Sequence, residues 1–164
     1  MILANEHWNE TEGYRNGQPC CPSFERYSQY DKIGWFLMFT ARDREQLVGY
    51  AGMYIVPSMH TQMTIATEDT WFLLPDYRRG RNAIQFYNYV EEECKKRDVT
   101  EINMTAKMTN QAGRILEYLG YKETARQFIK FLTPMTRIAD SVIPANQTED
   151  KTDVGNSQIT ANSL

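Results

Sequence analysis

The chain has 164 residues, of which 41% are hydrophobic, 12% aromatic and 24% charged. This length and composition predict a single globular domain that can bury a core without disulfides or structural metals. The net charge of −3 argues against an extended basic surface, so no nucleic-acid partner is expected.

The first half of the chain predicts two helices and an antiparallel hairpin. Residues 3–15 form the first expected helix, and a second helix begins after a Ser23 cap and ends at Gly34. Short runs of aromatic and apolar residues at 35–41 and 47–56 flank a charged turn. Such runs are typical of two strands paired in a hairpin.

The second half predicts a strand–helix–strand unit. A strand at 62–74, a helix at 81–97 and a strand at 101–108 follow one another, and the helix carries its apolar residues on one side. This connection places the two strands parallel, with a right-handed crossover. A further helix at 110–119 and a closing strand at 121–132 complete an expected α/β fold, a mixed sheet with helices packed on it.

The composition changes after Pro134. Residues 139–164 contain no aromatic side chain and are rich in Asn, Thr, Ser, Asp and Gln. A segment of this kind cannot bury enough apolar surface to fold. We therefore expect a folded domain at 1–134 and a polar, disordered tail at 135–164.

The cysteines and the first residues indicate the compartment. Cys20, Cys21 and Cys94 do not have the spacing of metal ligands, and an adjacent pair of cysteines rarely forms a relaxed disulfide. The first residues include charge and lack the apolar core of a signal peptide, and no apolar run is long enough to span a membrane. These features predict a cytoplasmic protein without a metal or a membrane anchor.

The junction between the strand 62–74 and the helix 81–97 carries the main functional signal. Residues 75–83 read Pro-Asp-Tyr-Arg-Arg-Gly-Arg-Asn-Ala. The first N–H groups of a helix have no partner within the helix and can bind an anion, and arginine side chains add bidentate donors for phosphate. We interpret this segment as a diphosphate-binding loop; the alternative is a plain charged turn.

This loop resembles that of the GNAT superfamily of N-acetyltransferases, which carries Arg/Gln-x-x-Gly-x-Gly/Ala between its fourth strand and third helix. Arg78 matches the first position and Ala83 the last, while Arg81 replaces the middle glycine and Gly80 stands one position early. Residues 110–121 resemble a second block of the superfamily, Asn-x-x-Ala followed by Leu-Gly-Phe. The order of elements also resembles this superfamily. The arrangement of His60, Asp69, Pro75 and Arg78 looks most like that of its bacteriophage-type members.

The resemblance implies the acyl-CoA N-acyltransferase fold, in which a splayed pair of parallel strands receives acetyl-CoA as the cosubstrate. An N–H group near Leu73 is then the expected donor to the thioester oxygen. The residues expected to bind acetyl-CoA lie on the strand end, on the loop and helix start, and before the last helix: Phe72, Leu73, Leu74, Arg78, Arg79, Gly80, Arg81, Asn82, Ala83 and Asn110.

Acetyl transfer to an amine also needs a base, because an ammonium group has no lone pair. Glu68 fits the spacing of the family's carboxylate base before the loop arginine, and Asp69 fits the bacteriophage-type pattern. Neighbouring strand residues face opposite sides of a sheet, so we expect only one of the two to reach the acetyl group, and Glu68 is preferred. The alternative is a solvated pair on an exposed strand edge.

The position of the family's proton-donating tyrosine is occupied by Leu116, and Tyr118 lies on another face of the same helix. Tyr118 is a candidate acid, with a packing role as its alternative.

The resemblance implies direct acetyl transfer to a primary amine of a small molecule or protein. This would take place in the host cytoplasm if the chain is encoded by a phage. A monomer and a homodimer both remain open. The alternative function is a catalytically inactive binding module on the same fold, acting as a phage accessory or host-interaction protein.

Overall fold

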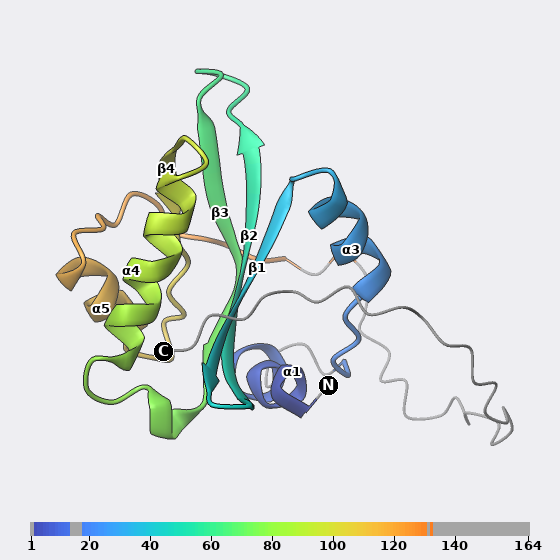
Figure 1. Cartoon of the computed structure of the whole chain (residues 1–164), viewed down its shortest axis with the longest axis vertical. Helices are drawn as coiled ribbons and strands as arrows, with labels where there is room; N and C mark the ends of the chain where they lie inside the picture. The colour runs from blue at the N-terminus through green and yellow to red at the C-terminus, as the bar shows by residue number, and fades with distance from the viewer. Residues whose placement is uncertain (1, 14–17, 131, 133–164) are drawn as a thin grey trace, which may run out of the picture.

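The computed structural model describes residues 2–13, 18–130 and 132, and its centre is a four-stranded mixed sheet (Figure 1). The strands lie side by side in chain order, and they are β1 (Phe36–Asp43), β2 (Gln46–Pro57), β3 (Thr64–Leu73) and β4 (Val99–Asn103). The first two pairings are antiparallel, and β3 pairs with β4 in parallel. The predicted hairpin, the strand–helix–strand unit and the mixed α/β sheet are therefore confirmed.

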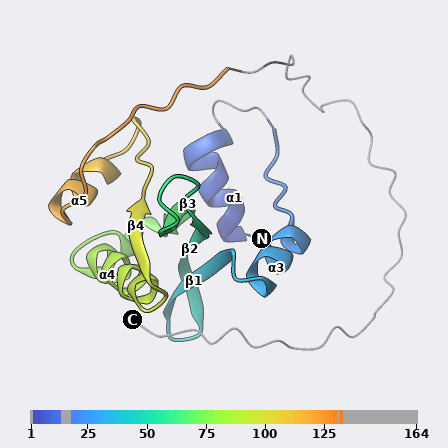
Figure 2. The same cartoon turned by 90° about the horizontal axis from the view of Figure 1, so that it is seen from above.

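Helices cover both faces of the sheet (Figures 1 and 2). One face carries α4 (Asn82–Lys95) and α5 (Ala112–Tyr118). The other face carries α1 (Ile2–Trp8), the π-helix η1 (Asn9–Gly13) and α3 (Phe24–Lys32). The described part of the predicted first helix is thus divided between α1 and η1.

The core lies between the sheet and α4. The helix buries residues at i, i+3, i+4, i+7 and i+11, as its sequence pattern predicts, and these are Ala83, Phe86, Tyr87, Val90 and Cys94. Four of them belong to one core cluster with buried residues of the strands, among them Val48, Ala66 and Leu73, and Tyr87 stacks on Trp71 of β3. Burial of a Phe or Val side chain contributes about 1.5–3 kcal/mol, so this helix face fixes α4 on the sheet.

A β-bulge in β3 positions the two candidate carboxylates. Gly52 of β2 opposes Thr70, whereas Met53 opposes Glu68, so Asp69 is an extra residue in β3. A bulge bends its strand and changes the direction of the side chains that follow it. A Cβ atom at Gly52 would lie 2.5 Å from Phe36 Cζ, so glycine allows the close packing at this point.

The parallel strands β3 and β4 separate at the bulge. They pair only between Thr64 and Thr67 of β3, although β3 continues to Leu73. Residues 68–73 of β3 therefore have a pairing edge on the β4 side that β4 does not occupy. This separation is the splayed parallel pair that the family resemblance implies.

The prediction of a closing strand at 121–132 is wrong for the described residues. Residues 121–130 form neither strand nor helix, and the side chains of Phe128 and Leu132 are 90% and 86% exposed. Strand propensity alone does not add a strand to the sheet, because a strand must also pair with a free edge.

The predicted end of the domain at residue 134 and the tail at 135–164 lie outside the described residues. No helix in the described ranges has the length and apolar character needed to cross a membrane.

Candidate active site

The backbone of Leu73 faces the opening between β3 and β4. The N–H of Leu74 donates to the carbonyl oxygen of Val48 at 2.8 Å, and Leu73 stands opposite Gly49 of β2. Hydrogen bonding alternates along an antiparallel pair, so the N–H and C=O of Leu73 point away from β2. The predicted oxyanion donor therefore faces the separated edge. The N–H of Leu74, by contrast, is bound to β2, so of the predicted group it is Leu73 that offers its N–H to a ligand.

Glu68 lies where the two parallel strands separate. Its Oε2 accepts a hydrogen bond from the N–H of Thr105, which follows β4, at 3.1 Å. Burial raises the pKa of the Glu68 carboxyl, while the Thr105 hydrogen bond and the charge of Lys107 oppose this rise. Glu68 is half-buried beside the opening. Because a carboxylate with a raised pKa is a stronger base, this position suits Glu68 to accept a proton.

Asp69 faces the other side of the sheet. The hydroxyl of Tyr27 on α3 donates to Asp69 Oδ2 at 2.9 Å. Burial and this hydrogen bond both raise the pKa of the Tyr27 hydroxyl, which stays protonated as the donor. The structure therefore separates the two neighbouring carboxylates: Glu68 contacts the segment after β4, and Asp69 links α3 to the sheet.

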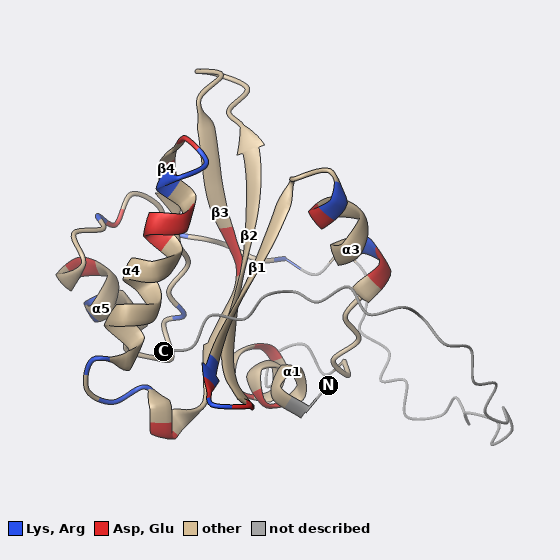
Figure 3. Cartoon of the chain, in the orientation of Figure 1, with Lys and Arg blue, Asp and Glu red and all other residues tan. Residues whose placement is uncertain are grey.

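The N-terminus of α4 is uncapped, and the space beside Gly80 is open. No side chain caps the helix at Arg81, and Gly80 has a positive φ of +68° with no atom within 4 Å of a built Cβ. Figure 3 shows the basic loop before α4. Arg79 and Arg81 are exposed, whereas the side chain of Ala83 is buried, so Ala83 offers only its backbone to a ligand. Uncapped N–H groups beside exposed arginines are suited to a diphosphate.

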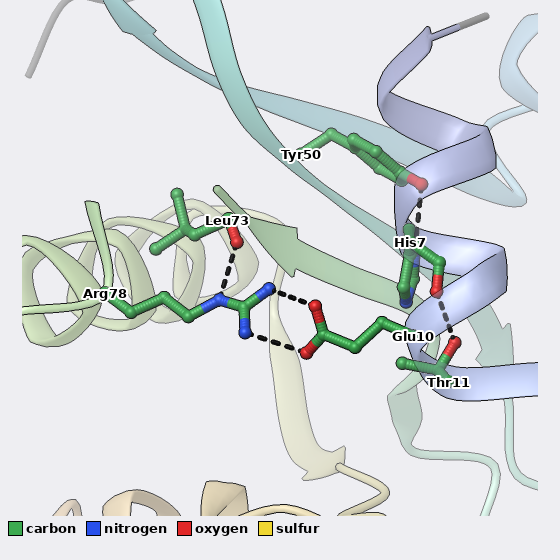
Figure 4. Close-up of polar contacts among 6 residues, drawn as sticks. All are labelled: His7, Glu10, Thr11, Tyr50, Leu73 and Arg78. Atoms are coloured by element: carbon green, nitrogen blue, oxygen red, sulfur yellow. Dashed lines mark hydrogen bonds and ion pairs between the residues drawn. The ribbon is translucent and has the colours of Figure 1, made fainter. Parts of the chain in front are cut away.

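The guanidinium of Arg78 points toward α1 and η1 (Figure 4). Its Nε donates to the carbonyl oxygen of Leu73 at 2.7 Å, and its two terminal nitrogens form a bidentate pair with Glu10, each at 2.7 Å. The guanidinium also lies 5.1 Å from the centre of the Phe72 ring. These bonds use three of the five N–H donors of the guanidinium and hold it on the α1 side of the sheet, while a role of Arg78 in diphosphate binding stays a prediction.

The π-helix η1 contacts both sides of the opening. Glu10 pairs with Arg78, which follows β3, and Glu12 pairs with Lys107, which follows β4. Both acidic residues come from one short segment, so η1 bridges the two separated strand ends. The sequence assigned no role to these residues, because their partners lie 68 and 95 positions away along the chain.

His7 is a further residue near the opening that sequence reasoning missed. Its Nδ1 lies 2.8 Å from the Tyr50 hydroxyl (Figure 4). The same atom lies 3.1 Å from the Thr70 hydroxyl, and the ring stacks on Phe72 with centroids 4.9 Å apart. Burial is the main cause that lowers the pKa of His7 to about 4. The imidazole is therefore neutral at neutral pH and anchors α1 to the sheet.

This lowered pKa predicts a loss of stability in mild acid. The unfolded chain binds a proton at His7 below about pH 6.5, its ordinary pKa, whereas the folded chain does not until about pH 4. The free energy of unfolding is thus expected to fall as the pH drops from 6.5 to 4. Thermal melts of wild type and His7→Gln across this range test it. The difference between the two proteins should shrink with falling pH, and a constant difference would contradict it.

Tyr118 and Asn110 lie around α5. The side chain of Tyr118 is 75% exposed and lines an open, apolar pocket with Ile84, Arg114 and Ile115 between α4 and α5. Leu116, at the position of the family's tyrosine, is only 7% exposed. Asn110 Oδ1 accepts a hydrogen bond from the N–H of Ala112 at 3.0 Å and so stabilises the start of α5.

Among the described residues, no cluster of His, Cys, Asp or Glu could hold a metal ion.

Several solved structures share this fold at low sequence identity. An aminoglycoside acetyltransferase, HMB0005, from an uncultured soil metagenomic sample is 17% identical, with a TM-score of 0.64, over 80% of this chain and 87% of the other. A ribosomal-protein-alanine N-acetyltransferase from Brucella melitensis biovar Abortus 2308 is 16% identical, with a TM-score of 0.58, over 79% and 92%. A transcriptional regulator from Bacillus halodurans C-125 is 20% identical, with a TM-score of 0.59, over 65% and 73%. Likeness at this level shows the fold alone.

A comparison with curated proteins found no match. The family model of the acetyltransferase (GNAT) family matches residues 3–121, from α1 through the end of α5. The matched range includes the splayed strands and the loop before α4, and it covers most of the chain. The chain therefore belongs to the GNAT family of acetyltransferases.

Proposed function

We propose that the protein transfers the acetyl group of acetyl-CoA to a primary amine, of a small molecule or a protein, by direct attack. The observation that carries this proposal is the separation of β3 from β4, with the Glu68 carboxylate at one end and the outward N–H of Leu73 at the other. Acyl transfer to an amine requires a base and a donor to the developing oxyanion.

The start of α4 supports acetyl-CoA as the cosubstrate. Acetyl-CoA carries an activated acetyl group and a diphosphate. Main-chain N–H groups of residues 79–83 would hold the diphosphate, and exposed Arg79 and Arg81 would add positive charge. The fit is good because no side chain competes for the first N–H groups of this helix.

Each residue then has a defined task. Glu68 accepts the proton of the attacking amine, directly or through a water molecule. The N–H of Leu73 stabilises the oxyanion, a contribution of about 3 kcal/mol for one such donor. Because Leu116 has no proton to give, the leaving thiolate is protonated by solvent or by Tyr118. The acceptor amine itself is not selected by this fold.

A free-thiol release assay tests the proposal. Wild-type protein is mixed with acetyl-CoA and a panel of polyamines, aminoglycosides and peptides with free N-termini or lysines. We expect thiol release above the rate of hydrolysis with at least one amine, together with an acetylated product detected by mass spectrometry. Absence of acetyl-CoA binding in calorimetry would overturn the proposal.

A second candidate function is a GNAT-fold binding module without turnover. Two observations favour it: Leu116 is buried at the position of the family's tyrosine, and the Arg78 side chain is bound to Glu10. The same assay separates the two functions. A binding module would show no thiol release with any amine, whether or not CoA binds.

A further inference from the structure

The segment that follows β4 does not continue the parallel pairing with β3. The register of the pair ends at Thr67 and Asn103, and a continued register would bring residues 104–107 alongside Glu68 and the residues after it. Instead, residues 104–107 form neither strand nor helix, and the N–H of Thr105 donates to the Glu68 carboxylate at 3.1 Å. A side chain of β3 therefore binds the segment that would otherwise extend the sheet.

The same segment is bound a second time, by η1. The Lys107 ammonium pairs with the Glu12 carboxylate, and the two side chains are 28% and 17% exposed. The pair between Lys95 and Glu92 on α4 is 63% and 62% exposed. An exposed ion pair contributes little to stability, whereas a shielded pair is costly to break, because one partner keeps its charge where water is scarce. Glu12 thus fixes residues 104–107 more firmly than a surface pair would.

The end of β3 is bound by the same π-helix. Glu10 pairs with Arg78, and Arg78 Nε donates to the carbonyl oxygen of Leu73 at 2.7 Å (Figure 4). The charges of both pairs act on one imidazole, since the two carboxylates raise the pKa of His7 and the two cations lower it. One short segment therefore fixes both strand ends around the N–H of Leu73, the proposed oxyanion donor.

We propose that the pair between Glu12 and Lys107 is a positioning pair for acetyl transfer, which keeps residues 68–73 of β3 open to acetyl-CoA by holding residues 104–107 on η1. This inference rests on the proposed function. Without the pair, residues 104–107 lose one of two contacts, and the distance between the strand ends varies. Fewer molecules then have the separation that acetyl-CoA needs, and the apparent Kd rises by the inverse of the competent fraction.

Reversal of the charges gives the first test, with the Kd for acetyl-CoA measured by calorimetry. Glu12→Lys is expected to raise the Kd about 10-fold, which corresponds to a competent fraction of about one tenth. The direction is informative, because added positive charge alone would strengthen the binding of an anionic cosubstrate. The double variant Glu12→Lys, Lys107→Glu has the wild-type net charge and restores an ion pair, so its Kd should return to within about threefold of wild type. Glu92→Lys is the matched control, and it should leave the Kd unchanged.

Hydrogen exchange of the Thr105 amide gives a second test that needs no ligand. Glu12→Lys should make this amide exchange about 10-fold faster, while the amides in the middle of α4 keep their wild-type rates, and the double variant should restore slow exchange. Equally faster exchange throughout the chain, or a double variant that does not recover, would mean that the pair only stabilises the fold, and the inference would be wrong.

The outcome also separates this inference from the proposed function. A wild type that binds acetyl-CoA, together with a Glu12→Lys variant of unchanged Kd, would overturn the positioning role alone. A wild type without affinity for acetyl-CoA would overturn the proposed function and this inference with it.

Discussion

Replacement of Glu68 by glutamine is expected to lower kcat/KM for amine acetylation at neutral pH by about 10²- to 10⁴-fold, the usual contribution of a general base. Glu68 is the carboxylate that lies at the separation of β3 and β4. Glutamine has the same shape and keeps an oxygen that can accept from the N–H of Thr105, so the fold should be preserved. The rate is measured by thiol release, and acetyl-CoA binding is measured in parallel.

The pH dependence gives an independent test of the same residue. Burial raises the pKa of Glu68, and only its deprotonated form can act as a base, so the wild-type rate should fall as the pH drops through this raised pKa. The Glu68→Gln variant should lack this acidic limb. A wild-type profile without the limb, or a variant that keeps it, would remove Glu68 from the mechanism.

Asp69→Asn is the matched control for Glu68→Gln. Asp69 accepts a hydrogen bond from the Tyr27 hydroxyl on the opposite face, and asparagine keeps an oxygen that can accept it more weakly than a carboxylate does. The free energy of unfolding should therefore fall by about 1 kcal/mol or less, and kcat/KM should be nearly unchanged. If Asp69→Asn stops turnover and Glu68→Gln does not, then Asp69 is the base and the assignment is reversed.

Local patterns in the sequence were sufficient to predict most of the fold. The helical spacing around Phe86 and Val90, the Ser23 cap and the end of the helix at Gly34 all correspond to the structure. The cap is visible directly, since Ser23 accepts a hydrogen bond from the N–H of Arg26. These features depend on neighbours within a few residues, and such interactions are encoded in the order of residues themselves.

The features that were missed depend on contacts between distant parts of the chain. His7 meets Thr70 across 63 positions, and the role of η1 arises only because Glu10 and Glu12 reach the two strand ends. For residues 121–132 the sequence predicted a strand that the described residues do not form. The strand propensity of this segment is evident from the sequence, but pairing depends on the position of a free edge, which propensity does not determine.

The contacts of η1 also determine where the Arg78 side chain lies. The bidentate pair with Glu10 and the hydrogen bond to Leu73 use its donors on the side of the sheet that carries α1. In the proposed site, a diphosphate at the start of α4 would therefore be held mainly by main-chain N–H groups and by the exposed Arg79 and Arg81. Arg81 is the N-cap residue of α4, and it occupies the position of the middle glycine in the family loop.

Arg81→Asp is expected to weaken CoA binding by about 100-fold, or roughly 3 kcal/mol, because it removes one positive charge and adds a negative charge beside the diphosphate. The same substitution should not destabilise the protein. A carboxylate at a helix N-terminus interacts favourably with the helix dipole, by about 0.3–1 kcal/mol. Calorimetry with CoA and thermal melts should therefore give opposite signs for binding and for stability. The loss of affinity should also decrease at high salt, since Arg81 is exposed and its charge is screened.

Arg44→Asp is the matched control, because it makes the same change of charge at the turn between β1 and β2. Arg44 has a φ of 53°, a left-handed conformation that aspartate tolerates. If the diphosphate binds at the N-terminus of α4, as we propose, CoA affinity should be unchanged in this variant. An equal loss of affinity in both variants would mean that the net charge of the protein, rather than a local site at the N-terminus of α4, controls CoA binding. Unchanged affinity in Arg81→Asp would mean that the diphosphate does not bind at the start of α4, and the proposed cosubstrate site would be wrong.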